Sequence, residues 1–589
     1  ERFDFAPLPP PGTPDTAARR LLAVASAFGI GTTGDPTHFA SNNWAVAPSR
    51  TRDGLALLAG DPHLDLTLPS IWYEVHLVVP GQLDEYGVSI AGLPGVVLGF
   101  TRDVAWSFTN TGADVMDFYR ETVDDTLHPT KYRVDGAWLP IEQRVEPYRD
   151  PSGNVVHVDT LRFTRRGPLS RRGRDWLSMR WTALEPSHDV QALIAGAEAT
   201  SARAFLDSLA AYFFVPAQNI IAADRGGTIA IRSTGHIPLR PRGTDGMTIF
   251  DGSSSASDWT GFWPVSQYPQ AFNPAQGYLA SANQQPIDPR VAPAYQGDDR
   301  SFEPWRAMQI NRLLRADSQV TVDDMRRFQV DPGSERAELF MPYLLGAVRH
   351  ADSAGHADST LRAAGRILAA WDMRYTHDNR GAALFEQALR NIRRDLWDEL
   401  DDGTERRVAL PSWDVTLEAM AQPASTWWDD RRTKTVVEDR DAIIARALHA
   451  AYDTLARRYG PPRDGGWRWD TVARVPIAHL LGLPGFSDMN LRTSGGIGTL
   501  NPAMDGGGAG PSWRMVVQLG PEIRAWATYP GGQSGNPASP WYDNRIPGWL
   551  AGQLDTLYLP RDPGGVDAHH LSASLTLAPA SAASRRGGH

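Results

Sequence analysis

The sequence predicts an α+β protein in which antiparallel sheets stack in layers and a mostly helical region is inserted before the last strands. Short strand-like segments separated by turn residues fill most of the stretch from residue 43 to residue 237. Apolar residues then recur at helical spacing over about 301–460, and strand-like segments return after Trp469. Helices and strands in separate blocks, with the sheet resumed at the end, are typical of a layered fold.

The composition fits a large folded protein. The chain has 589 residues, of which 42% are hydrophobic and 9% aromatic, so it can bury a sizeable core. Its formal net charge is −10 and no basic block occurs, which argues against a nucleic-acid partner. The absence of cysteine excludes disulfides, thiolate metal sites and cysteine catalysis. No apolar run reaches about 18 residues, so no segment is expected to cross a membrane.

The first two strands are expected to form a hairpin. Residues 43–47 and 55–59 suit strands, and the turn between them ends in Asp53-Gly54. A hairpin centred between Thr51 and Arg52 places Ser41 opposite residue 62, with His63 as its neighbour. A serine at a strand start most often caps or is solvated, so the pair alone is weak evidence of a nucleophile.

The remaining elements follow from periodicity and turn residues. A helix is expected to begin at Thr13-Pro14-Asp15 and to end at Gly29. Strands are expected at 71–79, 96–100, 104–110, 158–164, 176–182 and within 219–237, and a helix at 202–213. Further helices are expected at 305–314, 337–348, 359–371, 382–396 and 441–459, and late strands at 514–519 and 525–529. Residues 577–589 are expected to form a frayed tail.

Two motifs point to a known family. The run Ser41-Asn42-Asn43-Trp44-Ala45-Val46, followed by Gly60-Asp61-Pro62-His63, resembles the start of the catalytic subunit of the penicillin acylase family. That family includes acyl-homoserine lactone acylases. The resemblance covers nearly all of 41–560, including segments 510–517 and 532–540. It implies a four-layer αββα sandwich with two antiparallel sheets.

The resemblance also implies how the chain is divided. In the family a precursor cuts itself just before this serine. Residues 1–40 would then be the tail of the first (alpha) subunit plus a processing spacer, and 41–589 the catalytic (beta) subunit. An ordinary N-terminal helix and loop is the alternative for 1–40. Most of the first subunit is expected to lie outside this chain, as a partner.

An N-terminal serine carries its own base. A hydroxyl needs a base to become nucleophilic, and a free α-amine has a pKa of roughly 7.7–8.0. The resemblance implies that the backbone N–H of Asn110 and the side chain of Asn283 hold the oxyanion. It implies that Arg306 orients Asn283. We expect His63 to hold the serine and its amine through hydrogen bonds.

A calcium site is a further expectation. Asp114 and Asp117, with the backbone carbonyl of Met116 between them, suit an oxygen-seeking cation. Two aspartates three residues apart are very common, so this pattern alone decides little. The resemblance implies a structural Ca²⁺ bound by these three residues, by the carbonyl of Pro238 and by an acid near Asp299. No organic cofactor is expected.

The resemblance implies an amide hydrolase that deacylates a small N-acyl substrate such as a β-lactam. Leu64, Leu98 and Phe108 fall where relatives place pocket residues. Relatives that prefer phenylacetyl groups have two phenylalanines and a serine there, so acyl-homoserine lactone acylase activity is an alternative. The family's usual export implies a periplasmic or secreted location. The rivals are a Ser-His-Asp esterase that uses another serine and a non-enzymatic secreted binding protein on the same fold.

Overall fold

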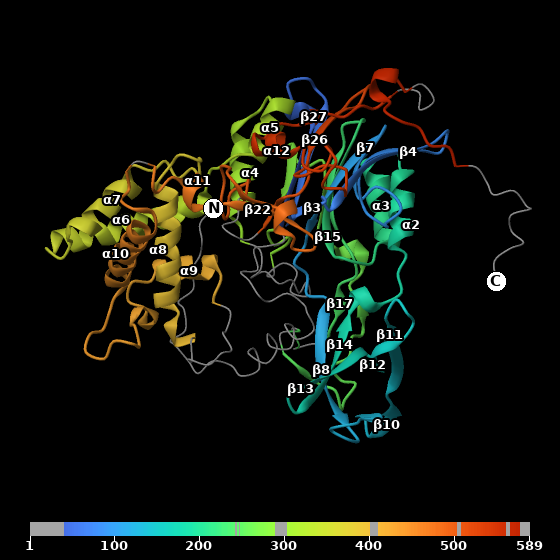
Figure 1. Cartoon of the computed structure of the whole chain (residues 1–589), viewed down its shortest axis with the longest axis horizontal. Helices are drawn as coiled ribbons and strands as arrows, with labels where there is room; N and C mark the ends of the chain where they lie inside the picture. The colour runs from blue at the N-terminus through green and yellow to red at the C-terminus, as the bar shows by residue number, and fades with distance from the viewer. Residues whose placement is uncertain are drawn as a thin grey trace, which may run out of the picture.

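Two antiparallel sheets stack at the centre of the molecule, and helices cover the outer face of each (Figure 1). The structure is a computed structural model that describes residues 40–241, 244, 246, 248–288, 303–400, 410–463, 465–502, 508–560 and 566–577. The helix expected at 13–29, Asp299 and nearly all of the expected tail lie outside the described residues.

The first central sheet contains Ser41. Its strands run in the order β21-β1-β2-β25-β26-β27, with β24 beside β2. Their bounds are β1 Ala40–Val46, β2 Ala56–Asp65, β21 Tyr278–Ser281, β24 Ala509–Pro511, β25 Arg514–Leu519, β26 Arg524–Thr528 and β27 Asp555–Thr556. Ser41 pairs with Pro62 across β1 and β2, which confirms the predicted hairpin register. Gly54 closes the turn with φ of +64°, a conformation that glycine adopts without strain.

The second central sheet packs against the first. Its order is β20-β16-β15-β7-β6-β5-β4. The bounds are β4 Trp72–Val79, β5 Leu83–Ile90, β6 Leu98–Thr101, β7 Val104–Asn110, β15 Gln218–Asp224, β16 Ile229–Thr234 and β20 Gln270–Phe272. Asn43 Nδ2 donates to the carbonyl of Ser107 at 2.8 Å. A Cβ on Gly60 would lie 2.1 Å from Ser107 Oγ, so β2 requires glycine where β7 passes it.

Two helix pairs complete the four layers. Helices α2 (Asp189–Ala197) and α3 (Ala202–Tyr212) cover the second sheet, where Trp106 and Phe205 stack with ring centroids 4.7 Å apart. Helices α4 (Trp305–Ala316) and α5 (Val322–Gln329) cover the first sheet. Trp44 and Ile310 belong to the buried cluster between that sheet and those helices. The predicted αββα arrangement is therefore present.

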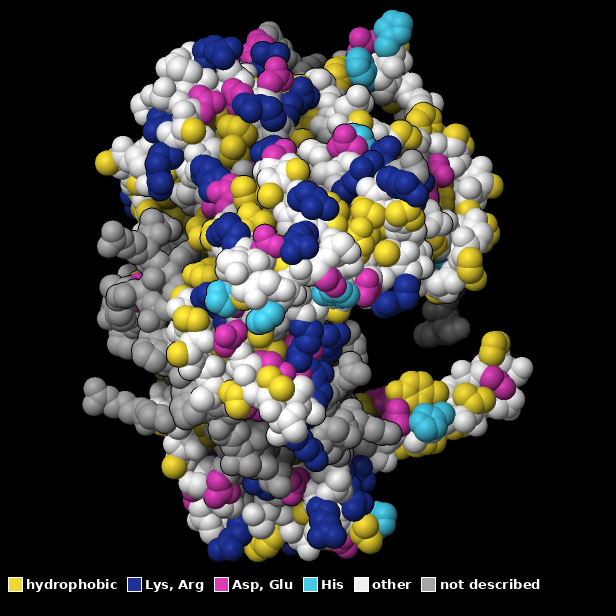
Figure 2. Space-filling model, turned by 90° about the vertical axis from the view of Figure 1, so that its left-hand side faces the viewer, with side chains coloured by type: hydrophobic (Ala, Val, Ile, Leu, Met, Phe, Trp, Pro, Cys, Tyr) yellow, Lys and Arg dark blue, Asp and Glu magenta, His cyan; other side chains and the backbone are white. Residues whose placement is uncertain are grey.

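The stretch for which the sequence predicts helices packs as a helical region around its own core, on the left of Figure 1. Its helices are α6 Glu335–Ser353, α7 Ser359–Ala369, α8 Gly381–Leu396, α9 Trp413–Met420, α10 Arg440–Tyr459 and α11 Trp469–Val472. Ser334, Asp358 and Asp439 cap α6, α7 and α10 by accepting hydrogen bonds from backbone N–H groups. On this side of the molecule basic and acidic side chains are interspersed (Figure 2).

Three further sheets lie outside the sandwich in the described part of the chain. The largest has the order β10-β9-β8-β14-β13-β12-β11, with β18 beside β8, and projects below the sandwich in Figure 1. Its bounds are β8 Met116–Val123, β9 Lys131–Val134, β10 Ala137–Pro140, β11 Glu142–Arg149, β12 Val155–Thr164, β13 Gly167–Arg172, β14 Asp175–Trp181 and β18 Phe250–Asp251. The others are β3 Thr67–Leu68 with β22 Val475–His479 and β23 Asp488–Leu491, and β17 Pro238–Leu239 with β19 Gly261–Phe262; helix α12 spans Ile546–Leu550. No helix among the described residues is long and apolar enough to span a bilayer.

Candidate active site

Ser41 lies near the start of β1 and contacts two groups that the sequence analysis singles out. Its backbone N–H donates to Asn283 Oδ1 at 2.6 Å, and its hydroxyl donates to the carbonyl oxygen of Ala40 at 2.6 Å. Asn283 Nδ2 in turn donates to the carbonyl oxygen of Asn110 at 3.0 Å. Three predicted site residues, separated by up to 242 positions in sequence, therefore meet at one point.

The position of Asn283 is set by backbone geometry. It follows β21, which pairs with β1 from Asn43 opposite Ser281 to Val46 opposite Tyr278. Its φ of +69° lies in the left-handed region, which asparagine tolerates better than most residues. Ser281 Oγ lies 2.7 Å from Thr109 Oγ1 and links the end of β21 to β7. The amide of Asn283 is thereby held beside the first residues of β1.

Asn110 is the last residue of β7 and pairs with Gln218 of β15. Its side-chain Oδ1 accepts a hydrogen bond from Gln218 Nε2 at 2.7 Å, so the side chain points to the neighbouring strand. Its carbonyl holds Asn283. The role of the Asn110 N–H as an oxyanion donor stays a prediction.

Arg306, on α4, binds three acceptors around the nucleophile. Its Nη1 donates to the carbonyl oxygen of Ser41 at 2.8 Å and to Asn42 Oδ1 at 2.7 Å. Its Nη2 donates to Asn283 Oδ1 at 3.0 Å, and the orienting role that the resemblance implies stays a prediction. Burial lowers the pKa of Arg306 to about 10, with Asp61 and Glu303 acting in the opposite direction. The guanidinium is therefore charged at neutral pH.

His63 differs from the expectation. It pairs with Ala40 across the hairpin, and cross-strand partners share a face of the sheet. The side chain of Ser41 belongs to the opposite face, because successive residues of a strand alternate. The polar contacts that the structure gives His63 place its Nε2 2.8 Å from Asp61 Oδ2 and 3.3 Å from Asn42 Nδ2, and neither is to Ser41. Its link to Ser41 is therefore indirect.

The three predicted pocket residues lie in the core between the two central sheets. Leu98 and Phe108 are buried there, and Leu64 packs against the same cluster. The ring of Phe108 meets that of Phe213 edge-on, with centroids 6.1 Å apart. This layer contains the face of β1 to which the Ser41 side chain belongs. The assignment of the three residues to a substrate pocket stays a prediction.

The expected calcium ligands are arranged around an arginine. Arg240 Nε donates to Asp117 Oδ2 at 2.8 Å, and its Nη2 lies 3.1 Å from Asp114 Oδ1. Trp259 Nε1 also donates to Asp117 Oδ2. Calcium needs roughly six to eight oxygen ligands around an open centre, whereas a cation of the protein itself binds both carboxylates. The described ligands, arranged this way, do not fit calcium.

The other expected calcium ligands are the carbonyl groups of Met116 and Pro238 and an acid near Asp299. Met116 begins β8 and Pro238 begins β17, and Asp299 lies outside the described residues. Among the described residues, no group of three or more histidine, aspartate or glutamate side chains is arranged to hold a metal ion. Sequence analysis missed Arg240, which stands 123 residues from Asp117. The resemblance implies calcium at this position, whereas the pairing of Asp114 and Asp117 with Arg240 leads us to expect none there.

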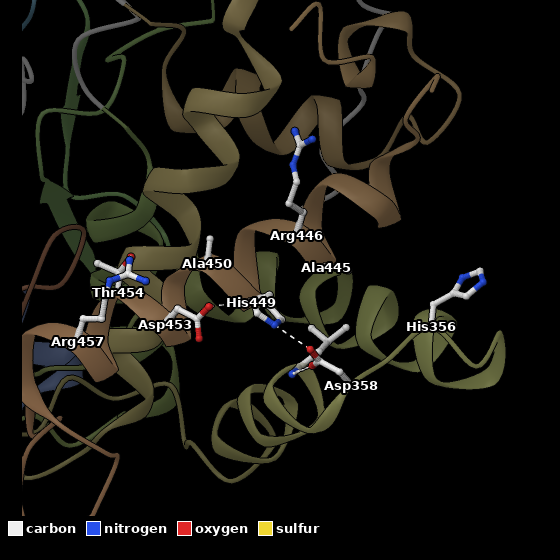
Figure 3. A pocket seen from close by; sticks show the side chains of 10 residues that line it. His356, Asp358, Ala445, Arg446, His449, Ala450, Asp453, Thr454 and Arg457 are labelled. Carbon is white, nitrogen blue, oxygen red and sulfur yellow. Dashed lines mark hydrogen bonds and ion pairs between the residues drawn. The ribbon is translucent and has the colours of Figure 1, made fainter. Parts of the chain in front are cut away.

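Two surface pockets lie away from Ser41, in the helical region. One, of about 430 Å³, lies between α7 and α10 and contains none of the predicted site residues (Figure 3). His449 Nε2 contacts Asp358 Oδ2 at 2.8 Å there, and its Nδ1 lies 3.3 Å from Asp453 Oδ2. Asp358 also caps α7. These contacts join two helices, and we assign this pocket a structural role. The other is lined by residues near the end of α7 and the start of α8.

Comparison with solved structures supports the fold. Thermostable penicillin G acylase from Alcaligenes faecalis matches with a TM-score of 0.72 at 20% identity, over 91% of this chain and 99% of that chain. This chain therefore shares the fold of that protein, and the αββα sandwich that the resemblance implies is confirmed.

Comparison of sequences gives the family. A family model described as penicillin amidase matches residues 5–563, so the chain belongs to the penicillin amidase family. Acyl-homoserine lactone acylase QuiP from Pseudomonas aeruginosa is 30% identical over 96% of this chain and 70% of its own length. Penicillin acylase 2 proenzyme from Pseudomonas sp. is 25% identical over 91% of this chain and 69% of its own length. The chain is thus a hydrolase that acts on amide bonds.

Proposed function

We propose that the chain is an N-acyl amide acylase whose nucleophile is the hydroxyl of Ser41, activated by the α-amine released when the Ala40–Ser41 bond is cut. The contacts of Ser41 carry this proposal: its N–H lies 2.6 Å from Asn283 Oδ1 and its Oγ lies 2.6 Å from the Ala40 oxygen. The hydroxyl, the bond to be cut and a side-chain amide are thus adjacent.

The cut is an acyl shift followed by hydrolysis. Ser41 Oγ attacks the carbonyl carbon of Ala40, and the hydroxyl proton passes to the departing nitrogen of Ser41. The C–N bond breaks, and an ester joins the Ala40 carbonyl to Oγ. Water hydrolyses this ester to the Ala40 carboxylate and a free serine. The same nitrogen, no longer an amide, can then act as a base.

Turnover repeats this chemistry on a substrate. The α-amine takes the proton of Oγ as Oγ attacks the substrate carbonyl, and the oxyanion is held by Asn283 Nδ2 and the Asn110 N–H. The protonated amine then gives its proton to the leaving nitrogen, and the C–N bond breaks. Water, deprotonated by the amine, then attacks the ester between the acyl group and Ser41 Oγ. The ester bond breaks, the acid leaves, and Oγ takes the proton back from the amine. Arg306 keeps Asn283 in place throughout, through its bond to Oδ1.

We propose acyl-homoserine lactones with aliphatic chains as the first substrates to test. QuiP of Pseudomonas aeruginosa, at 30% identity, is more similar to this chain than penicillin acylase 2 proenzyme, at 25%. Leu64 and Leu98 are aliphatic residues of the layer that would hold the acyl chain. Acylated β-lactams are the second candidate, because penicillin acylase 2 proenzyme is among the relatives. A periplasmic or secreted location and a first (alpha) subunit as partner remain part of this proposal.

The test is the intact mass of the purified protein under denaturing conditions, together with N-terminal sequencing. We expect a chain that begins Ser41-Asn42-Asn43, and we expect Ser41→Ala to remain uncut and inactive. The substrates are then ranked by their rates of hydrolysis, using hexanoyl-homoserine lactone, phenylacetyl-homoserine lactone and a phenylacetylated β-lactam. An uncut chain with full amidase activity would refute the proposed nucleophile.

A further inference from the structure

Behind Ser41, on the side of the sheet that faces α4, lies a buried carboxylate without an assigned role. Asp61 is fully buried and pairs with Asn42 across β1 and β2. Its Oδ2 accepts a hydrogen bond from Asn42 Nδ2 at 3.2 Å and lies 2.8 Å from His63 Nε2. The carboxylate therefore holds the residue that directly follows the nucleophile.

A short chain of hydrogen bonds connects Asp61 to the nucleophile. Asn42 Oδ1 accepts from Arg306 Nη1 at 2.7 Å, and the same nitrogen donates to the Ser41 carbonyl at 2.8 Å. Arg306 Nη2 reaches Asn283 Oδ1 at 3.0 Å. Asn42 Nδ2 also donates to the carbonyl of Leu500 at 3.0 Å, which fixes the amide from a second side. If Asp61 moved, Asn42 and Arg306 would move with it, and the backbone of Ser41 would be displaced.

Two buried arginines, Arg306 and Arg514, lie in the surroundings of Asp61. Arg306 and Arg514 are both buried, and no carboxylate oxygen in the described part of the chain lies within 4.0 Å of either guanidinium. Arg514 donates instead to the carbonyl of Trp549 and to Asn501 Oδ1, each at 2.8 Å. The negative charge of Asp61 acts on both arginines, and Glu303 acts on Arg306.

The titratable groups that face Asp61 have opposing effects. Burial raises the pKa of Asp61 well above its usual value, and Arg514, the Asn42 amide and Arg306 oppose that rise. Burial and the two arginines lower the pKa of His63 well below its usual value, so its imidazole is neutral. Two buried guanidinium cations require a nearby counter-charge, which the carboxylate form of Asp61 provides.

We propose that Asp61 is a positioning residue for the nucleophile: through Asn42 and Arg306 it orients the Ser41 backbone, and its charge offsets Arg306 and Arg514 beside the Ser41 α-amine. This inference rests on the proposed function, since it concerns the freed amine. A negative charge near an amine favours its protonated form, and a positive charge disfavours it. Asp61 and Arg514 should therefore shift the pKa of the amine in opposite directions.

The test is the pH profile of kcat/KM of the cut enzyme on a chromogenic N-acyl amide. The acid limb of that profile reports the base of the free enzyme. In Asp61→Asn we expect the limb to move to lower pH by on the order of one unit, as for charges roughly 10 Å apart at an effective dielectric constant of about 20. We expect kcat to fall about 10- to 100-fold, because the nucleophile is misaligned.

A second variant reverses the sign. Arg514→Met removes a positive charge, so its acid limb should move to higher pH. Asp395→Asn is the matched control: Asp395 is also buried and accepts from Arg432 at 2.8 Å, but it lies on α8 in the helical region. We expect this control to keep the wild-type limb and kcat, even where its melting temperature falls.

The outcomes separate the two proposals. An unmoved limb in Asp61→Asn, or a shift of both variants in the same direction, overturns the role of Asp61 while leaving the proposed function intact. If Asp61 were protonated in the wild-type enzyme, asparagine would carry the same zero charge, and the acid limb of Asp61→Asn would not move. If Asp61→Asn does not fold, Arg514→Met decides alone: a limb at higher pH supports the inference and an unmoved one overturns it. An active wild-type enzyme that is never cut contradicts the proposed function itself.

Discussion

Asn283 offers the sharpest perturbation of the candidate site, because one side chain has two separable effects. Its amide is the expected oxyanion donor, and its backbone has a φ of +69°. Asn283→Gly removes the amide and tolerates the backbone, whereas Asn283→Ala removes the same amide and adds left-handed strain of about 1–2 kcal/mol. Comparison of the two variants therefore separates catalysis from stability.

The magnitudes follow from the contacts. Loss of one oxyanion donor costs roughly 3–4 kcal/mol of transition-state stabilisation, or about 10²- to 10³-fold in kcat. Both variants also leave the N–H of Ser41 without the acceptor that lies at 2.6 Å in the uncut chain, a buried loss of about 1–3 kcal/mol in stability. We expect equal losses of kcat in the two variants, and a lower melting temperature for Asn283→Ala than for Asn283→Gly.

The assay has two stages. Intact mass first gives the fraction of each variant that has been cut, and only cut protein enters the kinetics. Initial rates on a chromogenic N-acyl amide then give kcat, and thermal unfolding gives the melting temperature. A wild-type kcat in cut Asn283→Gly would remove this residue from the site. A higher melting temperature for alanine than for glycine would refute the backbone argument.

Three further predictions concern Arg306, Gly60 and the expected calcium site. In Arg306→Lys we expect kcat of the cut enzyme to fall more than about tenfold, since an ammonium cannot reproduce the planar fork that binds Ser41, Asn42 and Asn283. In Gly60→Ala we expect a loss of about 1–3 kcal/mol in the free energy of unfolding, because the new Cβ would lie 2.1 Å from Ser107 Oγ. We expect EDTA or millimolar calcium to leave the melting temperature unchanged, because Arg240 already pairs with Asp114 and Asp117.

Each of these predictions has a matched control or a contradicting result. Gly485→Ala controls for Gly60→Ala, since a Cβ at Gly485 meets nothing within 4 Å, and equal melting temperatures would contradict the packing argument. A wild-type kcat in Arg306→Lys would show that only the positive charge of Arg306 matters and would contradict the argument from its planar fork. A rise of several degrees with calcium would show that the ion displaces Arg240 and that the resemblance predicts the site correctly.

The register of the first hairpin could be predicted from the sequence because it depends on local chemistry. The Asp53-Gly54 turn fixes the centre, and the pairing of Ser41 with Pro62 follows. The same alternation already implies that His63 and Ser41 belong to opposite faces, so the indirect position of His63 was readable from the spacing. Asp61 likewise stands within the Gly60–His63 motif and faces Asn42 for the same reason.

Long-range contacts could not be derived from the sequence. Ser41 and Asn283 are 242 residues apart, and only the family resemblance connects them before the fold is known. Arg240 and Arg514 form their contacts through side chains from distant strands and loops, and no local pattern distinguishes a buried arginine from a solvated one. The calcium expectation depended on two aspartates whose partner, Arg240, is not marked by any spacing.

The most direct test of the central claim is to find the atom that carries the acyl group. A slowly deacylated N-acyl substrate or a sulfonyl fluoride is incubated with cut and uncut protein, and tandem mass spectrometry locates the label. We expect the label on the oxygen of Ser41, at the N-terminus of the cut chain, and no label on uncut protein. A label on another serine such as Ser534, with unmodified Ser41, would contradict the account.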